Sequence, residues 1–254
     1  MKLYLLDYGR LGVSLASAFL GQENKKVPGV MLGALIEHPK DGLILYDIGP
    51  APNYEKLWPK SVLETYPILE YNSENRLDNI LAKLGYKLED ISGIIISHAH
   101  LDHAGGLEFF RGKDTPIYIH EEELKNMIIA VKEDFGPYLP HYVDPSFNWK
   151  VVRGDEVELF DNITLYHVPG HTPGSIAMLV ILKERNFLFL SDLAKFKDNL
   201  EKEIPLGFGL RDFYAWRKSI AKMKIIAKKY NAQVVFGHDL EVFNSLKHAP
   251  DFYE

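Results

Sequence analysis

One short segment concentrates side chains that bind metal ions. Residues 97–106 read SHAHLDHAGG, with three histidines and one aspartate between positions 98 and 103. Imidazoles and a carboxylate crowded in this way are costly to bury unless hydrogen bonds or a metal ion compensate them. A histidine-rich surface tract would not explain the apolar run GIIIS that leads into them. We therefore interpret four residues as metal ligands: His98, His100, Asp102 and His103.

Three later segments repeat the pattern of an apolar run that ends in a potential ligand. They read LYHVPGHTPGS, FLFLSDLAK and VVFGHD, and their candidate ligands are His171, Asp192 and His238. Strand ends can meet at one edge of a sheet, where loops direct side chains into a common site. A catalytic zinc site usually has three protein ligands and a water molecule. Seven ligands therefore predict two metal ions, with one carboxylate shared between them.

Strand-like and helix-like patterns alternate around these ligands. Runs typical of strands occur at 30–38, 42–49, 93–97 and 116–120, then through a strand-rich stretch from 150 to 191, and at 232–239. Helical patterns occur at 74–85, at 121 to about 135, and near 211–229. Residues 50–73 hold four prolines and several large apolar side chains, and we interpret them as a structured insertion or lid.

Both parts of the chain run from strands through a helix to a strand that ends at a histidine. This order predicts an α/β fold of four layers, an αββα sandwich of two packed mixed β-sheets with helices outside. We expect a single domain over 1–254, built from two similar halves at about 1–145 and 146–254.

Composition narrows the class of protein. Of the 254 residues, 46% are hydrophobic and 25% are charged, as in ordinary globular proteins. The net charge of −6 gives no reason to expect nucleic acid as a partner, and the lack of cysteine excludes thiolate ligands and disulfides. No signal-peptide pattern is present, and no apolar stretch approaches the ~20 residues of a membrane-spanning helix. We expect a cytoplasmic protein with neither nucleic acid nor membrane as partner.

The ligand segments resemble those of a known family. SHAHLDHAGG matches the HxHxDH motif of the metallo-β-lactamase superfamily, and GHTPGS, SD and GHD follow in the order of that superfamily. Within it the chain resembles the N-acyl-homoserine lactone lactonases, through RLDNILAKLGY, the stretch from YLPH to GHTPGS, EIP and FGHDLE. The resemblance assigns the first metal to His98, His100 and His171. It assigns the second to Asp102, His103 and His238, with Asp192 as the bridge, and places Asp47 behind a ligand histidine.

This resemblance implies a hydrolase with two divalent metal ions. We expect zinc, although His/Asp sites also accept cobalt, iron or manganese. The implied reaction opens a small-molecule lactone, an N-acyl homoserine lactone, by attack of a metal-bridging hydroxide on its carbonyl. Asp102 is the candidate for carrying a proton to the departing alkoxide. The alternatives are a glyoxalase II-like thioesterase or another small-ester hydrolase, and a non-catalytic or redox di-metal protein. The apolar segment 50–73 also allows a homodimer.

One position departs from the lactonase pattern. Where those lactonases carry a tyrosine that binds the substrate carbonyl, SDLAK places Lys195. Lys195 is a candidate catalytic residue that donates to an oxyanion or binds an acidic group, but the simpler expectation is a lysine in solvent. For the acyl chain we name the apolar candidates Trp58, Leu101, Phe109 and, in the loop PLGFGL, Phe208.

Overall fold

Two β-sheets form the centre of the computed structural model, which describes residues 1–132 and 137–254. Among these residues, the first sheet has the strand order β4-β1-β2-β3-β5-β6-β7 and the second has the order β12-β11-β10-β9-β8. The strands of the first sheet are β1 (Lys2–Ser14), β2 (Lys26–His38), β3 (Gly42–Tyr46), β4 (Ile68–Glu70), β5 (Ile91–Ile95), β6 (Ile117–His120) and β7 (Trp149–Val152). Those of the second are β8 (Glu156–Phe160), β9 (Ile163–His167), β10 (Ile176–Val180), β11 (Phe187–Ser191) and β12 (Gln233–Phe236).

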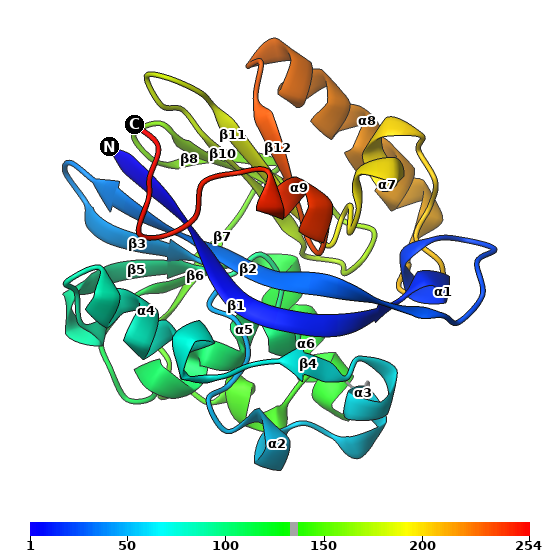
Figure 1. The fold of residues 1–254 in the computed structure, drawn as a ribbon, viewed down its shortest axis with the longest axis horizontal. Helices are drawn as coiled ribbons and strands as arrows, with labels where there is room; N and C mark the ends of the chain where they lie inside the picture. The colour runs from blue at the N-terminus through cyan, green and yellow to red at the C-terminus, as the bar shows by residue number, and fades with distance from the viewer. Residues whose placement is uncertain (133–136) are drawn as a thin grey trace.

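Helices cover the outer face of each sheet (Figure 1). Against the first sheet lie α2 (Tyr54–Leu57), α3 (Lys60–Thr65), α4 (Leu77–Lys83), α5 (Leu101–Ala104) and α6 (Glu121–Lys132). On the opposite side, beyond the second sheet, lie α7 (Lys197–Glu201) and α8 (Phe213–Lys229). The other α-helices of the described residues are the short α1 (Leu15–Ala18) and α9 (Leu240–Asn244). The predicted four-layer sandwich is confirmed. No helix in the described part of the chain is long and apolar enough to span a membrane.

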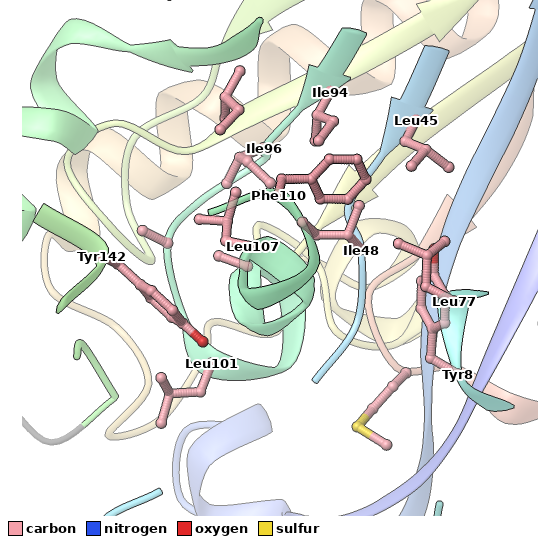
Figure 2. Packing of buried hydrophobic residues seen from close by; sticks show 14 of the residues in the cluster. Tyr8, Leu45, Ile48, Leu77, Ile94, Ile96, Leu101, Leu107, Phe110 and Tyr142 are labelled. Atoms are coloured by element: carbon pink, nitrogen blue, oxygen red, sulfur yellow. The ribbon is translucent and has the colours of Figure 1, made fainter. Parts of the chain in front are cut away.

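Separate hydrophobic clusters fill the three spaces between these four layers. One lies between the first sheet and its helices, and Figure 2 shows Leu45, Ile94 and Phe110 packed within it. A second lies between the sheets, where the ring of Tyr46 from the first meets that of Phe189 from the second. The third packs Trp216 of α8 against the outer face of the second sheet. Because both faces of each sheet are covered, its strands are apolar along most of their length.

The N-terminal strand β1 is an element that the sequence patterns did not single out. Leu3 and Leu5 face the second sheet while Tyr4 and Leu6 face the helices, so almost every side chain is buried. Such a strand lacks the alternation that marks a half-buried one. It pairs with β2 along most of its length and with β4 on its other side.

The strand-rich stretch after residue 149 divides between the two sheets. β7 pairs in parallel with β6 and completes the first sheet, whereas β8 pairs with β9 and opens the second. Gly154 turns the chain between them at a φ of 104°, a value that favours glycine.

The remaining helices and strands lie close to their predicted positions. Residues 50–73 are structured, as expected, and contribute α2, α3 and β4. The predicted helices at 74–85 and 211–229 are confirmed as α4 and α8. The helix predicted from Glu121 is confirmed as far as Lys132, and its expected end near residue 135 lies outside the described residues.

Candidate metal centre

The seven predicted ligands come from loops at the ends of four strands. His98 and His100 follow β5, and Asp102 and His103 lie in the short helix α5. The other three follow or precede strands of the second sheet: His171 in the β9–β10 loop, Asp192 directly after β11, and His238 two residues after β12. The structure brings all seven together as overlapping groups of three whose ligand atoms lie within 4.8 Å of one another.

The first group consists of three imidazoles, of which those of His98 and His171 are buried and that of His100 is half-buried. His100 Nδ1 lies 3.0 Å from His98 Nε2 and 3.0 Å from His171 Nε2. Burial, together with the neighbouring imidazoles, holds the pKa of His98 and of His100 well below the usual value, and burial lowers that of His171 to about 4. Neutral rings at these distances present three nitrogen lone pairs to one point, as a metal ion requires.

The second group contains Asp102, His103 and His238, with Asp192 between the two groups. Asp102 Oδ2 lies 3.5 Å from His103 Nε2 and 3.6 Å from His238 Nε2. Asp192 Oδ1 lies 3.0 Å from His238 Nε2, while its Oδ2 lies 3.3 Å from His171 Nε2 in the first group. One carboxylate therefore presents a different oxygen to each group.

The outward-facing nitrogens of three of these histidines are held by the surrounding chain. His103 Nδ1 donates a hydrogen bond to Asp47 Oδ2 (2.8 Å), His171 Nδ1 donates one to Gly209 O (2.6 Å), and His238 Nδ1 donates one to Val30 O (2.9 Å). A proton held at Nδ1 leaves the Nε2 lone pair of a neutral imidazole directed at the centre.

Asp47 lies behind the second group, where the resemblance placed it. Its side chain is buried, and besides His103 it accepts hydrogen bonds from the backbone N–H and the hydroxyl of Ser97. The hydroxyl of Ser97 in turn lies 3.1 Å from His98 Nδ1. The Asp47 carboxylate thus orients His103 of the second group and, through Ser97, His98 of the first group.

These donors fit a metal ion. His103 Nε2 and Asp192 Oδ1 are buried and have no hydrogen-bond partner among the described residues, although they lie only 3.4 Å apart. Orphaned polar atoms of this kind are costly in a protein interior. A cation bound between them would satisfy both.

Lys195 differs from the expected solvent-exposed lysine. Its side chain is only 4% exposed, and its Nζ lies 2.8 Å from Asp192 Oδ2. Burial alone would lower the pKa of Lys195, but the Asp192 carboxylate outweighs burial and raises it. The position lies between β11 and α7, at the end of a run of buried residues from 187 to 195.

A cavity opens over this cluster. Its lining includes His100, Asp102, His171, Asp192, Lys195 and His238, together with an apolar wall of Leu11, Trp58, Val62, Tyr66, Leu101 and Phe208. Trp58 and Leu101 are buried, whereas Phe208 is 58% exposed. Three of the four predicted apolar contacts therefore line the cavity.

Phe109 was predicted to line this cavity and does not. It lies in a 3₁₀ turn at Gly105–Phe110, where it packs against the hydrophobic cluster between the first sheet and its helices. Its ring centroid lies 5.8 Å from the Arg76 guanidinium carbon. The turn directs this side chain toward α4 and away from the histidines. An apolar residue near a ligand motif is thus part of the core here.

Several cavity and support residues escaped the sequence analysis. Tyr66 and Arg211 line the cavity, Ser97 and Ser191 lie against His98, and buried Glu123 accepts hydrogen bonds from both ligand loops of the first group. Ser97 directly precedes the first histidine, and this adjacency is its only signal in the sequence. Glu123 stands in the run EEE, which reads as a solvent-exposed helix start.

Comparisons with known proteins agree with this arrangement. The sequence model of the Metallo-beta-lactamase superfamily matches residues 34–238. An N-acyl homoserine lactonase from Bacillus sp is 32% identical over 99% of this chain and 98% of its own length. The N-acyl homoserine lactonase AiiB of Agrobacterium fabrum is 29% identical over 100% and 99%.

Solved structures of lactonases share the fold of this chain. An N-acyl homoserine lactone hydrolase with the product N-hexanoyl-L-homoserine bound at its catalytic metal centre superposes with a TM-score of 0.87 at 28% identity, over 99% of this chain and 98% of that one. A variant of AiiA from B. thuringiensis with N-decanoyl-L-homoserine bound also has a TM-score of 0.87, at 27% identity over 99% and 98%. With its fold, its convergent His/Asp cluster and its sequence over nearly the whole length, the chain belongs to the metallo-beta-lactamase superfamily.

Proposed function

We propose that this chain is an N-acyl homoserine lactone lactonase that uses two divalent metal ions, zinc being the first choice. The observation that carries the proposal is the pair of ligand groups joined by Asp192 under an apolar-walled cavity. Relatives that align over its whole length are N-acyl homoserine lactonases. A structure of similar fold holds a hydrolysed lactone at its metal centre.

The charges around the cavity support two divalent cations. Asp47, Asp102, Asp192 and Glu123 are all buried or nearly so, and Lys195 is the buried ammonium beside them. With the ligand histidines neutral, as metal binding requires, four carboxylates and one ammonium leave three negative charges in a region of low dielectric, which is costly. Two divalent ions turn that excess into a single positive charge, which suits an anionic nucleophile or a carboxylate product.

When bound, the metal ions supply water of lowered pKa and polarise the carbonyl oxygen of the substrate. The residues of the chain do the rest. We assign His98, His100 and His171 to the first ion. The second is assigned to Asp102, His103 and His238, with Asp192 shared and Asp47 fixing the tautomer of His103.

Two residues handle the proton and the developing negative charge. Asp102 lines the cavity and is 16% exposed, so its carboxylate can take up a proton and pass it to the departing alkoxide. Lys195 holds its ammonium at the cavity wall, where it can donate a hydrogen bond to the carbonyl oxygen as charge builds there. Trp58, Leu101 and Phe208 offer an apolar surface to the acyl chain.

A substrate panel on purified protein of known metal content tests the proposal. It includes short- and long-chain acyl homoserine lactones, γ- and δ-lactones, S-lactoylglutathione and a cephalosporin. We expect ring opening of the acyl homoserine lactones, followed as proton release. Thioester cleavage without lactone opening would favour the glyoxalase II-like alternative, and bound metal with no turnover on any of them would favour a non-catalytic protein. The cytoplasmic location and the homodimer stay predictions of the sequence.

A further inference from the structure

Glu123 is a buried carboxylate to which the proposed reaction gives no task. It lies in the first turn of α6, and its exposed fraction is 0%. Within the described residues it forms no ion pair, so hydrogen bonds alone compensate its charge. A carboxylate kept in the interior on these terms is costly. Its neighbours Glu121 and Glu122, in the same turn, are partly exposed and pair with Lys125.

The hydrogen bonds to Glu123 come from both ligand loops of the first metal group. Oε1 accepts from the backbone N–H of Ala99 at 2.9 Å, and Ala99 stands between His98 and His100. Oε2 accepts from Thr172 Oγ1 at 2.6 Å and from the backbone N–H of Gly174 at 3.2 Å. Thr172 directly follows His171. One carboxylate therefore joins the loop that carries two of the imidazoles to the loop that carries the third.

Close packing fixes the position of Glu123 relative to these loops. A Cβ added to Gly174 would lie 2.0 Å from the backbone nitrogen of Glu123, so the loop rests directly on the first turn of α6. Tyr138 adds a further link, because its hydroxyl donates to Glu123 Oε1 at 3.1 Å while the centroid of its ring lies 4.8 Å from that of His100. Asn126 Nδ2 donates to the same hydroxyl at 2.7 Å.

We propose that Glu123 is a positioning residue for the first metal group, holding the loop of His98 and His100 in register with the loop of His171. The inference rests on the proposed metal-dependent function only in requiring that the cluster binds metal. Glu123 touches neither the ligand nitrogens nor the cavity. Its influence passes through the backbone N–H groups and the Thr172 hydroxyl, and a glutamine cannot reproduce it because the amide group presents N–H where an acceptor is needed.

The test compares Glu123→Gln with Glu122→Gln, a matched control on the same turn. Each protein is stripped of metal and titrated with Co²⁺ and with Zn²⁺ against a chelator, and the visible spectrum of the cobalt form is recorded. For Glu123→Gln we expect one of the two metal equivalents to bind about 10- to 100-fold more weakly, the usual effect of losing an outer-shell partner. The cobalt spectrum should change for that equivalent alone, and Glu122→Gln should match the wild type in both respects.

Thr172→Val keeps the carboxylate and removes a single donor, so it decides the question if Glu123→Gln does not fold. We expect it to weaken the same equivalent by a smaller factor. The proposal is overturned if a folded variant binds both equivalents with wild-type affinity and spectrum, or if both equivalents weaken equally. Because these readouts need no substrate, a wild-type protein that opens no lactone would refute the proposed function and leave this test intact.

Discussion

Replacing Lys195 with methionine tests whether the buried ammonium and the metal ions compensate the same carboxylate. Lys195 Nζ lies 2.8 Å from Asp192 Oδ2, and both side chains are almost fully buried, at 4% and 3% exposed. Removing one partner of a buried ion pair leaves an uncompensated charge and costs about 3–5 kcal/mol. Methionine keeps most of the length of the side chain, so little of this loss comes from a cavity.

In the metal-free protein the variant should therefore melt well below the wild type. One kcal/mol shifts the Tm of a protein near this size by about 2–4 °C, so the expected drop is about 6–20 °C. In the metal-loaded protein Asp192 faces cations, which replace the ammonium as its counter-charge. There we expect the difference in Tm to fall below about 4 °C.

Differential scanning calorimetry of both proteins, after chelator treatment and after zinc loading, measures the two differences. Lys197→Met is the control, because the Lys197 side chain is 40% exposed and its pair with Glu241 lies at the surface, where ion pairs contribute little to stability. An equal drop in Tm with and without metal would refute the reasoning, because it would mean that metal binding does not compensate Asp192.

Three further outcomes are expected. Asp102→Asn, assayed at full metal occupancy, should lower turnover of an acyl homoserine lactone by about 100-fold or more, since the amide cannot take up the proton; unchanged turnover would remove Asp102 from the proton path. Asp47→Asn should weaken metal binding by about 10- to 100-fold, because the hydrogen bond that orients His103 is lost. Chelator competition measures the metal affinity, and an unchanged value would contradict this role of Asp47. Glu37 lies far from the cavity. Burial alone would raise the pKa of Glu37, but hydrogen bonds from Tyr4, Tyr86 and Lys2 outweigh burial and lower it. Glu37 thus stabilises the fold above its unfolded pKa, and this contribution disappears as pH falls through the lower folded value. Glu37→Gln should destabilise the protein at pH 7 by about 1–3 kcal/mol. In urea titrations the difference should shrink as pH falls below the unfolded pKa of about 4.3, and a pH-independent difference would contradict this account.

The local sequence identifies functional residues well where these residues lie close together in the chain. Four of the seven ligands occupy residues 98–103, directly after the apolar strand β5, so their proximity follows from covalent connectivity. The other three ligands stand at or near the ends of apolar strands, and parallel strand ends in a layered α/β fold meet at one edge. This pattern was sufficient to predict both the αββα sandwich and the group of residues that the structure brings together.

Residues whose role depends on long-range packing could not be found in this way. Glu123 and its partly exposed neighbours in EEE are the same residue type in consecutive positions, and only the docking of α6 on the ligand loops separates the buried one from the others. Phe109 is as apolar as Leu101, yet Phe109, in the turn Gly105–Phe110, packs only against the core, whereas Leu101, in α5, lies in the core and also lines the cavity.

The sequence by itself determined the kind of chemistry, because imidazoles and carboxylates at HxHxDH spacing after a buried strand have few uses other than binding metal. Only the tertiary structure decided the state of Lys195 and the supports of the ligands. Whether a lysine reaches solvent or is enclosed beside Asp192 depends on which segments fold over it, and those segments come from distant parts of the chain. Burial is a property of the whole fold, and a charged side chain carries no local mark of it.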